Sequence, residues 1–357
     1  MNRLISLDIA RTIAVISIVM CHAASHTFKF NLEFSQSVTK ITMVAGYVLH
    51  DFGYLGVPIF LYLTGYLLLS KEYSNQDYLH FQKMKTLPLY LIYALWVILY
   101  NIFCHFASIQ RFSTTKTILE LLFLKESYTA SLWYLPMIIS YYLLLPLIAN
   151  CLQKMDKGTM LKLTILFSIG VFGMNHIAVI LNAINIKAKF TMNNGLHVST
   201  FALYMIWGYF CKEQVFEKFK TWKIALIGVV SFFLLIALHM FALSKGRVYW
   251  VSYEAPYIFA TSLSIFLLCL RTKFREGKIF TLIAYYSFPI YLLHMFFIYL
   301  LQPHVLALPT LLATKPLLLW TASFVASIPL AYIIKKWVPY GAQALYLKPI
   351  SIKKGRE

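Results

Sequence analysis

The segment LDIARTIAVISIVMCHAASH, residues 7–26, carries charged and titratable side chains inside a stretch that is otherwise apolar. Asp8 and Arg11 lie near its start, and His22 and His26 lie near its end. A charged side chain at the centre of a bilayer costs at least ~2.5–3.5 kcal/mol on the insertion scale unless a partner or water meets it. Arg11 is therefore expected to face protein or a cavity.

The composition of the whole chain identifies its class. Hydrophobic residues make up 60% of the 357 residues and charged residues 13%, against about 25% charged residues in soluble domains. The mean hydropathy is +0.70. Several runs of roughly 18 or more apolar residues are long enough to cross the hydrocarbon core as helices. A water-soluble globule is excluded, and the sequence predicts an all-α polytopic membrane protein.

About ten transmembrane helices can be drawn along the chain, with no internal repeat and no room for a separate soluble domain. The predicted spans are residues 5–25, 52–70, 86–106, 131–152, 160–184, 197–211, 223–243, 254–270, 279–301 and 316–338. Residues 112–125 are too short to cross and favour an amphipathic helix at the membrane surface. We expect one membrane-embedded domain over residues 1–357, ending in a basic cytoplasmic tail at about 339–357.

The distribution of charge predicts the orientation. Lys and Arg number 32 and Asp and Glu 13, for a net charge of +19. If both termini lie inside, the cytoplasmic connections carry about twice as many Lys and Arg as the outer ones, which is the positive-inside bias. The positive charge then needs no nucleic-acid partner. The cysteines stand singly and show no paired ligand spacing, so we expect neither a disulfide framework nor a metal site.

Arg11 and His22 share one face of the first predicted helix. Eleven residues at ~100° each amount to three turns plus about 20°, and they separate the two positions by roughly 16 Å along the axis. This spacing suits a long substrate in a central polar cavity, with an anionic end at Arg11 and a reactive end at His22. In a purely structural alternative, Asp8 holds Arg11 as a local ion pair one turn away, and His22 is a packing residue.

Most of the other histidines map to the outer half of the membrane on this topology. An outer cavity with imidazoles that titrate near neutral pH could take a proton from a hydroxyl group. Zinc binding is disfavoured, because only His22 and His26 have ligand spacing within one segment and no third ligand accompanies them. The histidines on this side are His26, His50, His105, His176, His197, His239, His294 and His304.

The stretch ARTIAVISIVMCHA, residues 10–23, contains Arg-x10-His in the first membrane helix and resembles the signature of acyltransferase family 3, whose members O-acylate surface glycans. GVPIFLYLTGYLLL, residues 56–69, resembles the second-helix pattern of the family, with Thr64 where the family has Ser. LWYLPMIISYYLLLPLI, residues 132–148, and YSFPIYLLHMFFI, residues 286–298, are similar to two further family segments. The resemblance covers essentially the whole chain.

This resemblance implies an enzyme of the bacterial cytoplasmic membrane that moves an acyl group from cytoplasmic acyl-CoA to a hydroxyl of a surface polysaccharide or glycolipid. Acetyl-CoA is the usual donor, and no metal is expected. His22 matches the essential histidine of the family and Arg11 its essential cation. His22 would act as the general base for the acceptor hydroxyl, or would carry the acyl group itself as an acyl-histidine.

The remaining candidate residues divide by role. Lys83 and Lys85 would bind the donor together with Arg11, or are ordinary positive-inside charges. Asp8, Thr64 and His294 would support the site. Trp133, Tyr134 and His26 would bind the acceptor, although aromatic residues are also common at membrane interfaces.

A different class of function is a proton-coupled transporter or flippase of a lipid-linked sugar or small solute, in which the histidines relay protons. The absence of an internal repeat weighs against a transporter. Membrane lipids are expected partners in either case.

Overall fold

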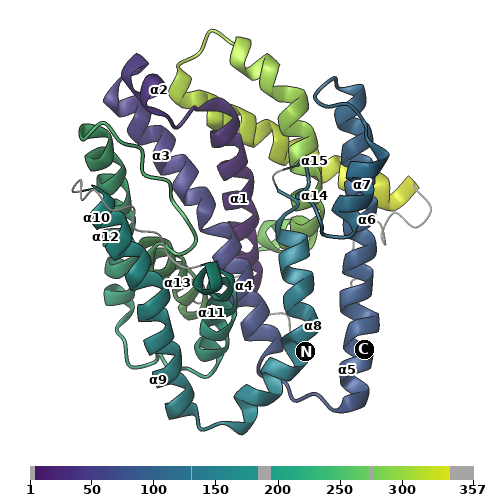
Figure 1. The fold of residues 1–357 in the computed structure, drawn as a ribbon, viewed down its shortest axis with the longest axis vertical. Coiled ribbons are helices and arrows are strands. Elements are labelled where there is room, and N and C mark those ends of the chain that lie inside the picture. Colours follow the sequence, from purple (N-terminus) through teal and green to yellow (C-terminus); the bar gives the residue numbers. More distant parts are fainter. Residues whose placement is uncertain (1–4, 130, 184–193, 273–276, 338–357) are drawn as a thin grey trace.

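The structure is a computed structural model that describes residues 5–129, 131–183, 194–272 and 277–337. The predicted basic tail at 339–357 lies outside these residues. Within the described ranges the chain consists of helices and their connections (Figure 1). The helices are α1 (Ile5–Thr27), α2 (Leu32–Ser37), α3 (Lys40–Tyr54), α4 (Gly56–Leu68), α5 (Asn75–Phe81), α6 (Leu87–Phe106), α7 (Thr114–Leu121), α8 (Tyr134–Lys154), α9 (Lys157–Ser168), α10 (Met174–Ala183), α11 (Asn194–Lys212), α12 (Thr221–Ser244), α13 (Pro256–Arg271), α14 (Lys278–Ala307) and α15 (Lys315–Trp337).

Each predicted span coincides with a helix or with helices joined end to end. Among the described residues, 8 helical stretches are long and apolar enough to cross a membrane. They are Ile5–Thr27, Lys40–Leu68, Asn75–Phe106, Tyr134–Lys154, Lys157–Asn182, Thr221–Ser244, Lys278–Ala307 and Leu312–Trp337. The shorter α13 and the 19-residue α11 match the other two predicted spans. The prediction of an all-α polytopic membrane protein is confirmed.

The second predicted span begins earlier than hydropathy indicated. The helical stretch starts at Lys40 as α3 and continues into α4 after a break at Leu55. The break lies next to Gly56, where an added Cβ would be 2.5 Å from the carbonyl oxygen of Ala14 in α1. The glycine therefore lets the start of α4 lie directly on α1, as expected for a kinked helix start.

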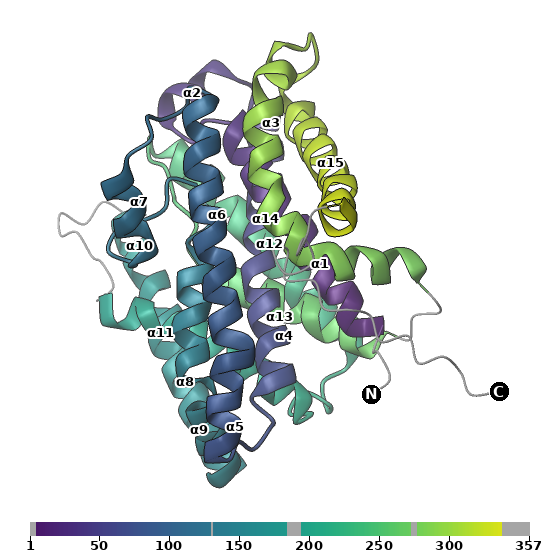
Figure 2. The same cartoon turned by 90° about the vertical axis from the view of Figure 1, so that its right-hand side faces the viewer.

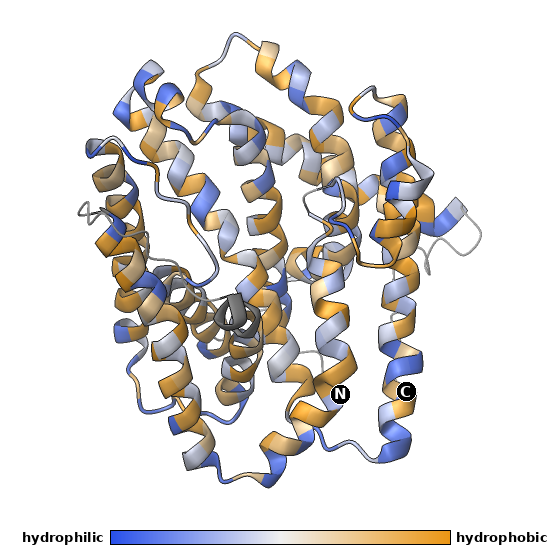
Figure 3. Ribbon diagram, in the orientation of Figure 1, coloured by the Kyte–Doolittle hydropathy of each residue, from blue (hydrophilic) through white to orange (hydrophobic). Residues whose placement is uncertain are grey.

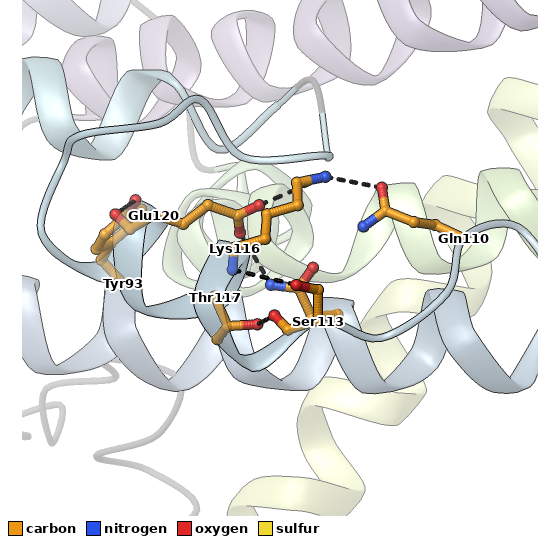
Figure 4. A network of polar contacts seen from close by, with 7 residues as sticks. Tyr93, Gln110, Ser113, Lys116, Thr117 and Glu120 are labelled. Atoms are coloured by element: carbon orange, nitrogen blue, oxygen red, sulfur yellow. Dashed lines mark hydrogen bonds and ion pairs between the residues drawn. The ribbon is translucent and has the colours of Figure 1, made fainter.

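The predicted surface helix at 112–125 is the shorter α7 in the structure, and it packs alongside α6 between Tyr93 and Asn101. Glu120 is fully buried and accepts a hydrogen bond of 2.9 Å from Asn101 of α6. Lys116 lies 3.7 Å from the other carboxylate oxygen of Glu120, and the Tyr93 hydroxyl donates to the Glu120 backbone carbonyl (Figure 4). These contacts hold α7 against the bundle.

Helix α1 lies at the centre of the bundle and packs against α3, α4, α13, α14 and α15 (Figures 1 and 2). It runs parallel to α14, because Thr12 donates to the carbonyl of Phe280 and Gln302 donates to the carbonyl of His26. Figure 2 shows a bend in α14, which contains Pro289, and an internal proline removes one helical hydrogen bond.

The two ends of the molecule can be named from the direction of α1, which runs upward in Figure 1. The last turn of α15 lies beside the first part of α14, where Lys335 donates to the hydroxyl of Tyr285. The start of α1 and the end of α15 thus both lie near the start of α14. Hydrophilic residues gather mainly at the upper and lower ends, and apolar residues cover the helices between them (Figure 3).

Two glycines set the crossing of α4 and α11. A Cβ added to Gly65 would lie 1.7 Å from the carbonyl oxygen of Met205, and one added to Gly208 would lie 2.2 Å from that of Tyr62. Small residues let membrane helices approach closely. The backbones of α4 and α11 therefore touch at this crossing.

The substitution Gly65→Ala is expected to destabilise the protein by ~1–3 kcal/mol or more, because the new methyl group must displace a backbone rather than a side chain. The measurement is the apparent unfolding temperature of purified protein in detergent. Gly170→Ala is the matched control, since nothing lies within 4 Å of its added Cβ. Equal unfolding temperatures for the two variants would show that α4 and α11 do not cross this closely.

Candidate active site

Two cavities lie along α1, one on each side of its midpoint. The lower cavity has a volume of about 400 Å³ and is lined by Arg11, and the upper one has a volume of about 290 Å³ and is lined by His22. Both residues therefore face protein cavities from one face of α1, as the periodicity predicted. The predicted central polar cavity is divided in two, and its larger part has mainly apolar walls.

The lower cavity brings together two predicted donor residues and one predicted supporting residue, each from a different helical segment. Arg11 comes from α1, Thr64 from α4 and Lys85 from the π-helical segment Gln82–Thr86 that joins α5 to α6. Thr64 donates its hydroxyl to the carbonyl of Phe60 in its own helix. Lys83 is exposed and does not line this cavity, so the structure separates the two lysines that the sequence analysis had paired.

Arg11 forms the local ion pair that was the structural alternative, and it lines the cavity as well. Its guanidinium lies 3.4 Å from a carboxylate oxygen of Asp8, and the Thr281 hydroxyl lies 3.5 Å from the other oxygen. The Asp8 side chain is 3% exposed and that of Arg11 is 30% exposed. Asp8 thus supports Arg11 and still leaves part of the guanidinium open to the cavity.

The upper cavity collects all three predicted acceptor residues around His22. His26 lies on α1, one turn beyond His22, and Trp133 and Tyr134 lie at the start of α8. Gln302 of α14 holds His26 in place, with 3.1 Å between its side-chain oxygen and Nδ1 of the imidazole. The Trp133 ring packs beside Tyr253, which also lines this cavity. The walls therefore combine aromatic faces with imidazoles.

Three side chains line both cavities and mark the boundary at which the cavities adjoin, which is called the wall below: Ile18, Tyr134 and Tyr291. Ile18 stands on the same face of α1 as Arg11 and His22, seven residues after the first and four before the second. The Tyr291 hydroxyl donates to the carbonyl of Ser131 at 2.6 Å. Arg11 lines only the lower cavity and His22 only the upper one, so the two residues lie on opposite sides of this boundary.

His294 of α14 is the nearest partner of His22 that the structure identifies. The two ring centroids are 5.2 Å apart, and His294 is fully buried. Its Nδ1 lies 2.6 Å from the carbonyl oxygen of Tyr291. A carbonyl can only accept, so Nδ1 carries the proton and Nε2 keeps its lone pair. That Nε2 has no hydrogen-bond partner among the described residues, which makes His294 a proton acceptor beside His22.

The upper cavity also contains His50, which the sequence analysis had counted among the outer histidines without assigning it a role. Its Nδ1 lies 3.0 Å from a carboxylate oxygen of Asp51, a residue that the sequence analysis missed. The other carboxylate oxygen lies 2.8 Å from Nε2 of His239 in α12. The available signal was an acidic residue inside a long apolar helix, which by default marks a functional position.

Comparison with curated proteins finds no match. Comparison with solved structures likewise finds none. A family model described as an acyltransferase domain matches residues 4–336, a range that holds both cavities and all candidate residues described above. With the arginine and the histidine of the first helix at two adjoining cavities, and with a match over nearly its whole length, the chain belongs to acyltransferase family 3.

Proposed function

We propose that this membrane acyltransferase transfers an acyl group, acetyl in the first place, from cytoplasmic acyl-CoA to a hydroxyl of a surface polysaccharide or glycolipid. One observation carries the proposal: Arg11 and His22 open from one face of α1 into two cavities that share a thin wall. A donor in the lower cavity would extend its thioester toward that wall, and an acceptor in the upper cavity would meet it there. The lower end is then the cytoplasmic side of a bacterial inner membrane.

The lower cavity suits the chemistry of acyl-CoA. Acyl-CoA is a long molecule that is anionic at one end and largely uncharged along its pantetheine arm. Arg11 and Lys85 supply the positive charge, and a guanidinium matches phosphate oxygens well. Leucine side chains such as Leu63 and Leu89 line the rest of the cavity. The upper cavity offers the faces of Trp133 and Tyr134, which are suited to stacking against a sugar ring.

His22 can promote the transfer by two routes. In the direct route it takes the proton of the acceptor hydroxyl while that oxygen bonds to the thioester carbon; the C–S bond then breaks, and the imidazolium returns its proton to the thiolate. In the covalent route a nitrogen of His22 first receives the acyl group and CoA departs as thiolate. The acceptor hydroxyl then attacks the acyl-histidine, and this second step needs another base.

The substitution His22→Ala is expected to abolish the ester, because both routes pass through this imidazole. Surface glycans from cells that carry the gene, lack it or carry the variant are compared by mass spectrometry. Glycans from cells with the wild-type gene should be heavier by one acyl group than glycans from cells that lack it. This extra mass should be absent from cells that carry the variant. Unchanged glycan mass together with altered solute uptake would instead favour the transporter.

Lys85→Ala is expected to raise the KM for acetyl-CoA more than Lys83→Ala, because only Lys85 lines the donor cavity. A lost charge-assisted contact of this kind accounts for about a tenfold change, or ~1.4 kcal/mol. The measurement is the initial rate of CoA release against acetyl-CoA concentration. Equal effects of the two lysines would place the anionic end of the donor outside the cavity.

The two cavities are expected to open to opposite sides of the membrane. The test uses Ser25→Cys at the upper cavity and Thr64→Cys at the lower one. Both variants are made in a background in which the accessible Cys21 and Cys151 are replaced by Ser. A small membrane-impermeant methanethiosulfonate should label Ser25→Cys on intact cells and Thr64→Cys only on inside-out vesicles. The reverse pattern would overturn the orientation, and labelling of both from one side would show that the wall is open.

A further inference from the structure

Asp51 is a carboxylate inside the membrane-spanning part of the molecule with 0% of its surface exposed. An isolated buried carboxylate is strongly disfavoured, so it requires partners for its oxygens. Here each oxygen has an imidazole: Nδ1 of His50 at 3.0 Å and Nε2 of His239 at 2.8 Å. The carboxylate thus connects α3 to α12.

The two imidazoles differ in what else they can reach. His239 is 1% exposed and is covered by Tyr47, whose ring stacks on it with centroids 4.0 Å apart. His50 lines the same cavity as His22. Its Nδ1 donates to the carboxylate, because a carboxylate oxygen accepts, so Nε2 keeps its lone pair as a base. Of the two, only His50 has a place on the cavity wall.

Glu120 shows what a merely structural buried carboxylate looks like in this molecule. It is also 0% exposed, but its partners are Asn101 and Lys116, and the group joins α6 to α7 (Figure 4). Neither Glu120 nor its partners line the cavity of His22. The difference between the two carboxylates is that one of them holds an imidazole at the wall of the acceptor cavity.

His22 has the surroundings of a nucleophile rather than of a carboxylate-supported base. Its neighbour is His294, whose Nδ1 is committed to the Tyr291 carbonyl and whose Nε2 has no partner among the described residues. A nucleophile, an adjacent base and a third group that orients the base form the usual arrangement for covalent catalysis. The structure supplies these in His22, His294 and the Tyr291 carbonyl.

We infer that the two sets of imidazoles divide the reaction, with His22 carrying the acyl group and His50 deprotonating the acceptor hydroxyl. Asp51 is the positioning residue of His50. The inference rests on the proposed acyl transfer and selects its covalent route. It adds His50 as a catalytic residue at the acceptor side of the cavity.

The chemistry balances over two steps. First, a nitrogen of His22 bonds to the acyl carbon, the C–S bond breaks with its electron pair going to sulfur, and the proton on the other His22 nitrogen passes to Nε2 of His294. Second, the acceptor hydroxyl gives its proton to Nε2 of His50, its oxygen bonds to the acyl carbon, and the C–N bond breaks with its electron pair returning to His22. His22 then recovers its proton from His294. Water on the lower side protonates the thiolate of CoA, and water on the upper side accepts the proton from His50.

Asp51→Asn separates the two steps experimentally. In the first measurement, purified full-length protein in lipid nanodiscs is incubated without acceptor and with acetyl-CoA labelled in the acetyl group, and the label bound to protein is counted. In the second measurement, glycan ester is determined in cells that carry the same variant. Asp51→Asn should retain protein labelling within about threefold and lose glycan ester by ~10²–10⁴-fold, the usual contribution of a general base. His22→Ala should lose both, and Glu120→Gln, the matched control, should lose neither.

A second variant guards against misfolding of the first. His50→Gln leaves Asp51 and His239 in place and should show the same separation, and Asp51→Glu should restore part of the glycan ester. Loss of protein labelling in both Asp51→Asn and His50→Gln, or normal glycan ester in either, would overturn the division of roles. Absence of label from the wild type would overturn the covalent route and this inference with it. The proposed function would survive that result, since it depends on the ester lost in His22→Ala.

Discussion

The cost of placing charge in hydrocarbon organises this molecule. Each buried carboxylate described above has one partner on its own helix and one on another helix: Asp8 has Arg11 and Thr281, Asp51 has His50 and His239, and Glu120 has Lys116 and Asn101. These pairings join α1 to α14, α3 to α12 and α6 to α7. Because a partner lost within the membrane leaves an unpaired buried charge, they specify which helices are neighbours where apolar packing alone would tolerate several arrangements.

Local periodicity was sufficient to predict the spans and the shared face of Arg11 and His22. It failed where the deciding contact came from elsewhere in the chain. The predicted second span excludes residues 40–51, which contain His50 and Asp51, because a hydropathy scale scores a polar residue as if it were exposed to water. In the structure His239 of α12 pairs with the Asp51 carboxylate. Lys83 and Lys85 look equivalent in sequence, but the π-helical segment that contains both turns only Lys85 toward the cavity. His294 was predicted to orient His22 or the acceptor, or to pack; its free Nε2 became evident only with the Tyr291 carbonyl in place.

The division of the cavity could not be predicted from sequence either. Ile18 lies on the expected face of α1, but α8 and α14 supply the two tyrosines that complete the wall. A helix face with Arg11 at one end and His22 at the other suggests a continuous passage when it is considered alone. Tyr134 at the start of α8 and Tyr291 of α14 lie where the two cavities adjoin, and their placement depends on packing between distant segments.

The wall has a chemical consequence for the proposed reaction, in which a cytoplasmic thioester is joined to an acceptor on the other side. A continuous aqueous passage would expose the thioester to hydrolysis and would leak ions across the membrane. Excluding water from a reactive intermediate prevents such side reactions, and here Ile18, Tyr134 and Tyr291 stand where the exclusion is needed. Of these three side chains, Tyr291 is anchored by its hydrogen bond to the carbonyl of Ser131. The same layer that keeps the two solutions apart would therefore be the point at which the acyl group passes from donor to His22.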